Sequence, residues 1–367
     1  MRGKRSPHRF VLIGRGTPMR ILHVIAGAKE GGAESIMLDA ALALAEAGVA
    51  QHVITREHNP ARLEALAKAG VPVTIASFDK LWREPTKAVI RNTIESFKPD
   101  VIHYWMGRAG TFAPKQWRAR SVGWYGGYYK LERFKNCAWH VGMTRDLAAH
   151  ILKQGAPEDR VSVLNSYANL DPLPPTPRAS LDTPEGAPAV LTLARLHWKK
   201  GLDTLLEALV GLPGVYSWIA GEGPLEADLK AMAEKLGVAD RVRFLGWRND
   251  RAGLLAACDV VAFPSRYEPF GNVTIEAWAA AKPLVVADAA GPAATVTNEV
   301  DALLVPKDDV AALREALRRV IEDAGLAKSL VENGTRSYEA NFTKTAFVRA
   351  SMALYERIRA SAENANV

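Results

Sequence analysis

The sequence lacks the features that mark several specialised classes of protein. Its 367 residues include only two cysteines, Cys137 and Cys258, which excludes a disulfide framework and indicates a reducing compartment. They also lack the CxxC or CxxH spacing of a zinc site. No run approaches the roughly 18 apolar residues that cross a bilayer. Residues 10–13 are too short an apolar run for a signal-peptide core, so we expect a cytoplasmic protein.

Positive charge is the one unusual feature of the composition. The net charge is +7, with 25 Lys and Arg against 15 Asp and Glu in residues 1–175, and 22 against 25 in residues 176–367. A basic balance favours nucleic acid, an anionic membrane or phosphorylated ligands as partners. Residues 1–18 contribute five of the positive charges. We expect that segment to be disordered or untranslated, because Met19 opens directly into a strand-like run.

Apolar runs alternate with helical patterns along the rest of the chain, which predicts parallel βαβ units and therefore an α/β fold. We predict strands at residues 20–26, 51–55, 71–75, 100–103, 139–142, 189–194, 215–220, 241–245, 259–263 and 283–287. We predict helices at residues 34–47, 59–68, 86–97, 144–153, 202–209, 224–236, 251–257, 272–281, 310–323, 327–333 and 343–360. These elements make two doubly wound domains, whose ligands should bind at the carboxyl ends of the strands, in the cleft between the domains.

One proline-rich stretch interrupts the alternation. Six of the 21 prolines lie in residues 170–188, a density that no helix or central strand tolerates. We therefore predict an N-terminal domain at residues 19–170, a linker at 171–188, a C-terminal domain at 189–342, and a final helix and tail at 343–367.

The strongest motif follows the strand predicted at residues 259–263 and enters the next helix. Gly271 allows the backbone to approach a ligand closely. The first turn of the helix should leave amides free and present the positive end of its dipole, which together form an anion site. These amides belong to Asn272, Val273 and Thr274. Glu268 lies before the turn and Glu276 lies within the helix, where a carboxylate suits the two hydroxyl donors of a vicinal diol.

The run EPFGNVTIE, residues 268–276, resembles the E-x7-E signature of retaining glycosyltransferases of the GT-B fold, in the group 1 or family 4 glycosyltransferases. The resemblance implies that Glu268 contacts hydroxyls of the donor sugar and that Glu276 binds the ribose of the nucleotide. Phe270 would then lie in the donor-binding loop.

Three further segments resemble motifs of the same family, in the same order along the chain. RLHWKKG, residues 195–201, is similar to the GRLxxxKG segment, which implies that Arg195 and Lys200 bind the donor diphosphate. The turn Gly221-Glu222-Gly223 resembles the G-x-G-P turn of the donor site, although the glycines also suit a purely structural tight turn. Gly31 and Gly32 resemble the GGAE loop, whose backbone approaches phosphate or sugar.

Residues 100–109 look like the branch of the family that builds bacterial lipopolysaccharide or other envelope glycans, but one family feature is missing. Many members carry a His-Gly pair where this chain has GWYGGYY at residues 123–129. His103 is a candidate substitute that would face the cleft on the acceptor side. Tyr128 belongs to an aromatic cluster that would serve either as a sugar platform or as plain packing.

The resemblance as a whole implies two Rossmann-like domains that face each other across a cleft, with the donor on the C-terminal domain and the acceptor on the N-terminal one. The last helix would pack back on the N-terminal domain. The expected reaction moves a sugar from a UDP- or GDP-linked donor to a glycan or glycolipid, with retention. We expect no cofactor, and no metal because the sequence contains no DxD. The basic N-terminal domain fits peripheral docking to the cytoplasmic face of the inner membrane.

Two other classes of function remain as alternatives. A GT-B epimerase would convert a nucleotide sugar without an acceptor, and a GT-B phosphorylase would hold a pyridoxal cofactor through a lysine. A nucleic-acid-binding protein would need a basic stripe with base-reading or stacking elements, and none of the familiar module signatures is present. A dehydrogenase is disfavoured because no GxGxxG follows the first strand.

Overall fold

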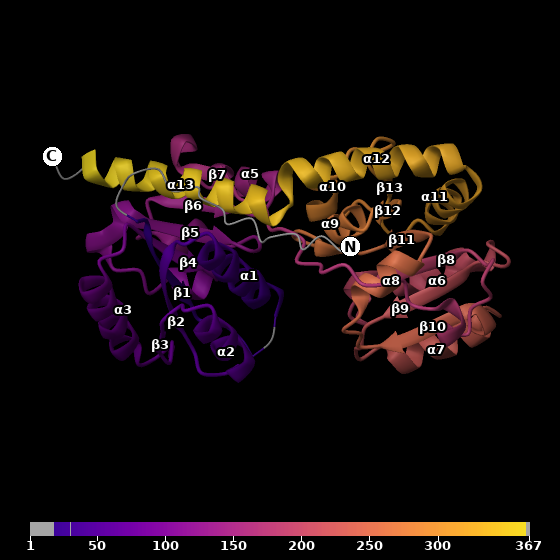
Figure 1. Ribbon diagram of the computed structural model, residues 1–367, viewed down its shortest axis with the longest axis horizontal. Helices are drawn as coiled ribbons and strands as arrows, with labels where there is room; N and C mark the ends of the chain where they lie inside the picture. The colour runs from indigo at the N-terminus through magenta and orange to yellow at the C-terminus, as the bar shows by residue number, and fades with distance from the viewer. Residues whose placement is uncertain (1–17, 30, 365–367) are drawn as a thin grey trace, which may run out of the picture. The chain divides into compact units, whose positions relative to one another are not determined.

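In the computed structural model the chain forms two compact units (Figure 1). The structure describes residues 18–29 and 31–364, so the expectation for residues 1–18 lies almost entirely outside the described residues. Unit 1 comprises Met1–Ser166 and Phe347–Val367, and unit 2 comprises Tyr167–Ala346. The predicted boundaries at residues 170 and 343 lie close to these divisions. No helix among the described residues is long and apolar enough to cross a membrane.

Unit 1 is built on a seven-stranded parallel sheet in the order β3-β2-β1-β4-β5-β6-β7. Its strands are β1 (Arg20–Ile25), β2 (Ala50–Thr55), β3 (Val73–Ile75), β4 (Val101–Trp105), β5 (Ser121–Tyr125), β6 (Trp139–Gly142) and β7 (Val161–Val163). Its helices are α1 (Gly32–Glu46), α2 (Pro60–Lys68), α3 (Arg83–Phe97), α4 (Met106–Gly110) and α5 (Arg145–Lys153). The short elements β5, β7 and α4 were not predicted from the sequence. β5 also contains Gly123, a residue type that is depleted in strands.

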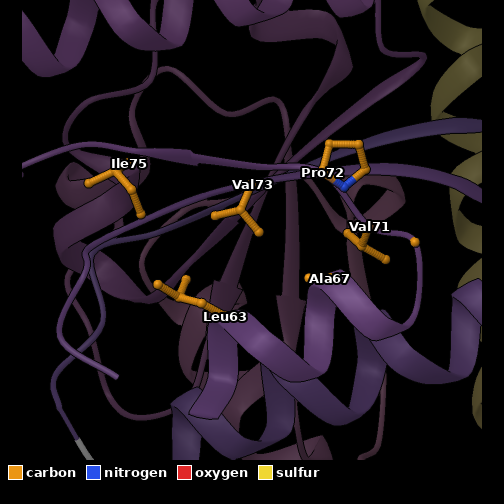
Figure 2. Close-up of a pocket in the computed structure, with 7 residues that line it drawn as sticks. Leu63, Ala67, Val71, Pro72, Val73 and Ile75 are labelled. Carbon is orange, nitrogen blue, oxygen red and sulfur yellow. The ribbon is translucent and has the colours of Figure 1, made fainter. Parts of the chain in front are cut away.

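The strand β3 lies at the edge of this sheet and leaves an apolar groove beside α2. The groove has a volume of about 490 Å³ and opens between the helix and the strand (Figure 2). Its lining residues are Leu63, Ala67, Gly70, Val71, Pro72, Val73 and Ile75. The amino end of α2 is fixed as its sequence predicts, because Asn59 caps it by accepting the amide N–H of Arg62.

Unit 2 is built on a six-stranded parallel sheet in the order β10-β9-β8-β11-β12-β13. Its strands are β8 (Ala189–Leu193), β9 (Tyr216–Ala220), β10 (Val242–Gly246), β11 (Val260–Phe263), β12 (Leu284–Ala287) and β13 (Leu303–Val305). Its helices are α6 (Leu202–Val210), α7 (Glu226–Lys235), α8 (Arg251–Ala257), α9 (Asn272–Ala279), α10 (Ala290–Thr295), α11 (Val310–Glu322) and α12 (Ala324–Asn341). The sequence analysis missed α10 and β13, and α12 is longer than predicted.

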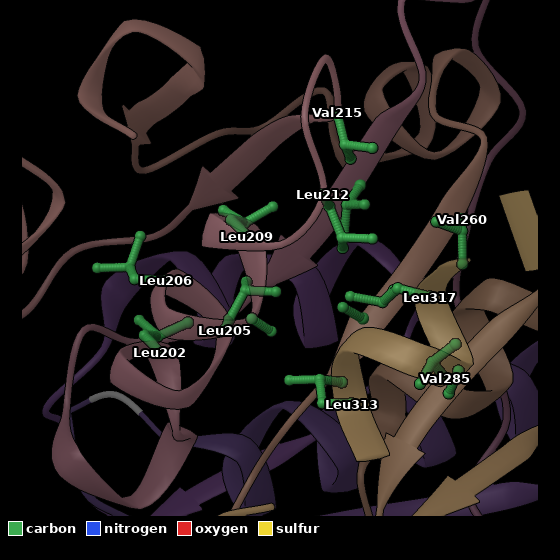
Figure 3. Close-up of a cluster of buried hydrophobic side chains, with 14 of the residues drawn as sticks. Leu202, Leu205, Leu206, Leu209, Leu212, Val215, Val260, Val285, Leu313 and Leu317 are labelled. Atoms are coloured by element: carbon green, nitrogen blue, oxygen red, sulfur yellow. The ribbon is translucent and has the colours of Figure 1, made fainter. Parts of the chain in front are cut away.

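The main core of unit 2 lies between its sheet and two helices. Leucines from α6 face Leu313 and Leu317 of α11, with Val260 and Val285 from the sheet completing the cluster (Figure 3). The apolar spacing of both helices is thus explained by one buried face each. In both sheets the chain adds strands first on one side of the initial strand and then on the other. This order is that of a doubly wound sheet, so the predicted α/β architecture is confirmed.

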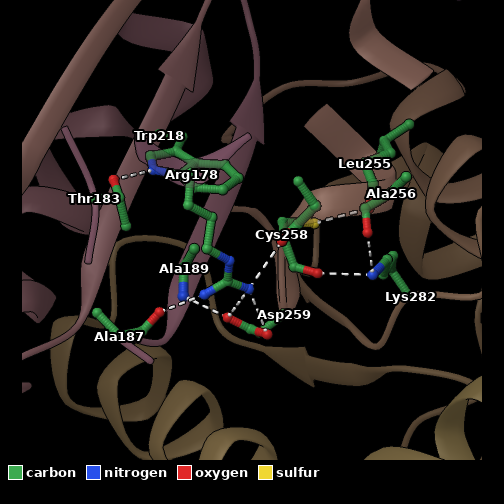
Figure 4. A network of polar contacts seen from close by, with 11 residues as sticks. Arg178, Thr183, Ala187, Ala189, Trp218, Leu255, Ala256, Cys258, Asp259 and Lys282 are labelled. Atoms are coloured by element: carbon green, nitrogen blue, oxygen red, sulfur yellow. Dashed lines mark hydrogen bonds and ion pairs between the residues drawn. The ribbon is translucent and has the colours of Figure 1, made fainter. Parts of the chain in front are cut away.

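The proline-rich segment predicted as a linker is held on unit 2 by its own side chains. Arg178 forms an ion pair with Asp259 at 2.9 Å, at the start of β11, and Thr183 accepts a hydrogen bond from the indole of Trp218 (Figure 4). The guanidinium of Arg178 also donates to the carbonyl of Ala257. From Arg178 onward the segment is therefore part of the packed unit.

The last helix, α13 (Lys344–Asn364), packs within unit 1 from Phe347 onward. Its buried side chains recur at helical spacing and are Phe347, Val348, Ser351, Leu354, Tyr355, Ile358 and Ala362. The Tyr355 hydroxyl shares a 2.9 Å hydrogen bond with Nδ1 of His103 in the middle of β4. Arg160 donates to Ser361 at 2.8 Å, which fixes the end of the helix.

Histidines occupy the middle of the unit 1 sheet in their neutral form. Trp105 donates to Nδ1 of His23 at 3.1 Å, so the proton of His23 lies on Nε2, which donates to Gln51. Burial lowers the pKa of His23 to about 4, although the bond to Gln51 opposes the shift. Burial, and then the neighbouring His23, hold the pKa of His103 well below its usual value. Burial also lowers the pKa of His140 to about 4.

We predict that unit 1 loses stability as the pH falls from about 6.5 towards 4. In this range the histidines are protonated in the unfolded chain but stay neutral in the folded unit, where their pKa is lowered. Each such group contributes up to about 1.4 kcal/mol per pH unit. Unfolding followed by calorimetry across this range should show a flatter dependence for His23→Gln. The matched variant His58→Gln, at an exposed position, should keep the wild-type slope; an equal slope in all three proteins would contradict the prediction.

Candidate active site

The predicted donor residues of unit 2 gather at the point in its sheet where the strand order reverses, between β8 and β11. β8 and β11 are neighbours in the sheet, and the chain leaves β8 towards β9 on one side and β11 towards β12 on the other. Ligands of doubly wound sheets bind at such a point, outside the carboxyl ends of the strands. The loop after β8 carries Arg195 and Lys200, and the loop after β11 carries Glu268.

Backbone contacts join these two loops. The amide of Arg266 donates to the carbonyl of Lys199 at 2.8 Å. Gly201 has a φ of +61°, and a Cβ atom there would collide with the carbonyl oxygen of Pro264. Only glycine combines this backbone conformation with so close an approach. Gly201 therefore sets the distance between the loops.

Arg266 reinforces this junction with its side chain, a role that the sequence analysis missed. Its guanidinium binds both carboxylate oxygens of Asp203 at 2.9 and 2.7 Å, and it donates to the carbonyl of Trp198 at 2.7 Å. Burial alone would raise the pKa of Asp203, but the bonds and charge of Arg266 outweigh burial and lower it. An arginine two residues before Glu268, with an aspartate two residues after the KKG run, was the available signal.

Lys200 and Glu268, both predicted in catalytic roles, form an ion pair with each other. Their side chains are 23% and 18% exposed, so the pair is partly buried but still reachable by a ligand. Arg195 is different: its side chain is exposed and makes no hydrogen bond or ion pair with a described residue. The site thus holds one half-buried neutralised pair and one cation that has no protein counter-ion among the described residues.

The G-x-G turn after β9 has a clear structural role. Gly221 has a φ of +148°, and Cβ atoms at Gly221 and Gly223 would meet the carbonyl oxygens of Ala194 and Leu196. Leu196 donates its amide to the carbonyl of Glu222 at 3.0 Å. The turn therefore fixes the backbone on both sides of Arg195.

The carboxylate of Glu222 accepts the amide N–H of Trp247 at 3.3 Å, which ties the turn to the loop after β10. Glu222 was predicted to bind the donor. In the structure one oxygen of its carboxylate already accepts the amide of Trp247.

The turn into α9 agrees in outline with the predicted anion site and differs in one amide. Gly271 has a φ of +89°, and a Cβ atom would lie 2.7 Å from the ring of Phe263. The amide of Thr274 donates to the carbonyl of Gly271 at 3.0 Å, so it is not free as predicted; the first turn of the helix is tight enough to use it. The amides of Asn272 and Val273 have no backbone partner among the described residues.

Phe270, predicted to be donor-binding, is buried at 4% exposure. The amide of Gly291 donates to the carbonyl of Glu268 at 2.8 Å, and a Cβ atom at Gly291 would lie 2.5 Å from the backbone of Phe270. The buried ring of Phe270 therefore anchors the loop to unit 2. The parts of the loop that a ligand could contact are its backbone and the carboxylate of Glu268.

Glu276 is also nearly buried, on the helix that the loop enters. Its carboxylate lies 3.3 Å from the guanidinium of Arg251 at the start of α8. Arg251 was not among the predicted site residues, because nothing in its local sequence distinguishes it from a solvent-exposed helical arginine. The ion pair gives the buried carboxylate of Glu276 a cationic partner from a separate helix.

The candidates in unit 1 fall into two groups. Gly31 and Gly32 lie exposed at the amino end of α1, as predicted, in a loop whose Ala28 amide is bound by the Glu34 carboxylate at 2.7 Å. His103 was predicted to face a cleft, and this is wrong: it lies fully buried in the middle of β4, bonded to Tyr355. The period-2 alternation of a strand end does not show which face a helix from the far end of the chain will cover.

The aromatic cluster of residues 123–129 divides in the same way. Trp124 and Tyr125 are buried strand residues of β5 and serve as packing. Tyr128 is partly exposed, and its hydroxyl donates to Asp146. Of the cluster, Tyr128 therefore remains accessible to a ligand.

Within residues 18–29 and 31–364, no three His, Cys, Asp or Glu side chains gather in an arrangement that could hold a metal ion. Both cysteines are buried free thiols, and burial raises the pKa of Cys258 to about 12.

The chain resembles known proteins over most of its length. The family model described as glycosyl transferases group 1 matches residues 175–337, and the model of glycosyltransferase family 4 matches residues 30–171. The lipopolysaccharide core biosynthesis glycosyltransferase LpsD of Rhizobium meliloti is 33% identical over 346 residues, which cover 92% of this chain and 98% of that protein. LpsE of the same organism is 32% identical, with 92% and 98% covered.

Solved structures share the fold at lower sequence identity. A glycosyltransferase from Rickettsia africae superposes with a TM-score of 0.83 at 20% identity, covering 94% of this chain and 99% of that one. HepE of Anabaena, in complex with UDP, gives a TM-score of 0.80 at 22% identity, with 92% and 100% covered. The predicted family and the predicted GT-B fold are both confirmed, and the chain belongs to the group 1, family 4 glycosyltransferases.

Proposed function

We propose that this glycosyltransferase moves a sugar from a nucleotide-diphosphate sugar to a glycan or glycolipid acceptor during assembly of lipopolysaccharide, with retention of anomeric configuration. The observation that carries the proposal is the junction of the two loops at the carboxyl edge of unit 2, which brings cations and helix amides to one place. The names of LpsD and LpsE support the pathway. Structures of HepE with UDP and with UDP-glucose support a UDP-linked donor, and GDP is the alternative.

The diphosphate would bind between Arg195 and the first turn of α9. Arg195 is exposed without a counter-ion among the described residues, so an anion can take that place without displacing a protein carboxylate. The amides of Asn272 and Val273, with the positive end of the helix dipole, would receive phosphate oxygens. Arginine and preorganised amides stabilise the charge that develops on a departing diphosphate. This arrangement requires no metal and no cofactor.

The pair of Lys200 and Glu268 would act at the junction of phosphate and sugar. Each charge compensates the other in a half-buried position, where an isolated charge would be costly. Hydroxyls of the sugar would donate to Glu268, while the ammonium of Lys200 would add positive charge on the phosphate side. The acceptor hydroxyl would then attack the face from which the diphosphate departs and pass its proton to the leaving phosphate.

Glu276 would bind the ribose. Its carboxylate offers two acceptor oxygens to the two hydroxyls of a vicinal diol, and Arg251 holds it in one orientation. The turn of Gly221 and Gly223 would contribute by positioning the backbone beside Arg195.

Unit 1 would receive the acceptor. Gly31 and Gly32 leave the backbone at the end of β1 open to a close approach, and Tyr128 offers an accessible ring. We place the reaction in the cytoplasm at the membrane face, where a growing glycolipid is available, and we expect no nucleic-acid partner.

We predict that Arg195→Ala lowers kcat by about 10² to 10³, because one preorganised donor to the leaving group is lost. The side chain is exposed, so the melting temperature should not change. The assay is release of nucleotide from a panel of UDP- and GDP-sugars. The matched variant Arg318→Ala, exposed on α11, should turn over at the wild-type rate, and an unchanged kcat for Arg195→Ala would refute the role of this arginine.

We predict that Glu276→Gln raises KM for the nucleotide sugar at least tenfold, because hydrogen bonds to a charged acceptor are worth about 1.5–3 kcal/mol. The matched variant Glu315→Gln, on an exposed helix face, should leave KM unchanged. Product analysis belongs to the same experiment: conversion of the nucleotide sugar without any acceptor would indicate an epimerase and would overturn the proposed transfer.

A further inference from the structure

The loop between β3 and α3 in unit 1 carries the most exposed large apolar side chains of the described residues. Leu81 is 89% exposed and Trp82 is 77% exposed, and the two are adjacent. We call residues 79–83 the apolar tip. Tryptophan and leucine are usually at least partly buried, and adjacent exposed apolar side chains often mark an interaction site.

The base of the tip is held rigidly. Phe78 is fully buried with a φ of +51°, and its amide donates to Oγ1 of Thr86 at 3.0 Å. Two arginines from separate segments, Arg56 and Arg108, donate to its carbonyl at 3.0 and 2.9 Å. The chain is therefore fixed just before the tip begins.

The tip itself is folded so that its apolar side chains point away from the unit. One carboxylate oxygen of Asp79 accepts the amides of Leu81 at 2.7 Å and of Trp82 at 2.9 Å. This turn occupies the backbone donors and lowers the pKa of Asp79. The exposure of Leu81 and Trp82 is thus part of a built turn and does not depend on a loose loop.

Positive charge surrounds the tip. Lys80 precedes the two apolar residues and is exposed. Arg83 follows them, with its guanidinium on the carbonyl of Thr111 and over the ring of Phe112. Arg56 and Arg108 bind the carbonyl of Phe78 at the base of the tip. The acidic groups nearby are already engaged: Asp79 binds the two amides, and Glu84 pairs with Lys87 at 2.6 Å and with Arg91 at 3.8 Å.

We infer that the apolar tip inserts into the interfacial layer of an anionic phospholipid bilayer. Tryptophan prefers this layer, where its ring meets acyl chains and its N–H meets headgroups. The exposed ammonium of Lys80 would bind anionic headgroups, and the nearby arginines would add to the positive potential, which favours an anionic surface over an uncharged one.

The position of the tip adds a consequence for the acceptor. β1, β2, β3 and β4 run parallel, so the loops that follow them emerge at the same edge of the sheet. The tip follows β3, and the Gly31–Gly32 loop follows β1. Insertion would therefore bring the acceptor edge of unit 1 to the lipid surface, a step that rests on the proposed function, whereas the docking itself does not.

The test is flotation of the full-length protein with phospholipid vesicles. Wild type should float with phosphatidylcholine vesicles that contain phosphatidylglycerol, and much less with phosphatidylcholine alone or in high salt. Leu81→Ser combined with Trp82→Ser should lower the partition coefficient at least about tenfold. Lys80→Ser should lower it about fivefold on the anionic vesicles only, because a basic residue near such a surface contributes about 1 kcal/mol.

Trp247→Ser is the matched control, since this tryptophan is 72% exposed in unit 2, and it should float like wild type. Unchanged flotation of the double variant would overturn the inference, as would failure of the wild type to float. In another outcome, a soluble oligosaccharide binds the tip and protects Trp82 fluorescence from an added quencher, while the protein fails to float with vesicles. That result would make the tip a glycan platform and would also overturn the inference. The measurement uses neither donor nor acceptor, so its failure would leave the proposed transfer reaction untouched.

Discussion

The candidate active site depends on one backbone contact, the approach of Gly201 to the carbonyl of Pro264. It joins the loops that follow β8 and β11, which the parallel sheet alone would only bring near each other. Arg266 secures the same junction through Asp203. In the reaction that we propose, this contact would let the cations of one loop and the helix amides of the other act on a single diphosphate. Charge preorganised in this way would need little rearrangement when the leaving group departs.

The parts of the fold that the sequence predicted well are those governed by local physics. Long amphipathic or apolar runs, such as those of α6, α11 and β1, reveal their structure by spacing, and Thr144 reveals the start of α5 by its capping hydroxyl. Short elements were missed for the complementary reason. β13 has three residues and α4 has five, too few for a period to appear.

The predictions for the site divide along the same line. The glycines at 201, 221, 223 and 271 could be placed because a strand-to-helix turn at which two backbones meet requires them. Partners from distant segments could not be foreseen. The pairing of Glu276 with Arg251, of Lys200 with Glu268, and of His103 with Tyr355 each joins elements whose approach is set by the tertiary fold. His103 is an example, since this candidate for the acceptor side lies buried and bonded to Tyr355 of the last helix.

The placement of that helix has a consequence for how the protein is made. Unit 1 is formed by residues that precede and follow unit 2, and α13 supplies Tyr355, which bonds the buried His103, together with a row of buried apolar side chains. During synthesis the strands of unit 1 emerge first, yet their cover leaves the ribosome only after all of unit 2. Unit 2 can complete its core while unit 1 still exposes an unfinished apolar face. The nascent protein therefore has an interval in which chaperones can bind unit 1, and this interval lasts until α13 has been synthesised.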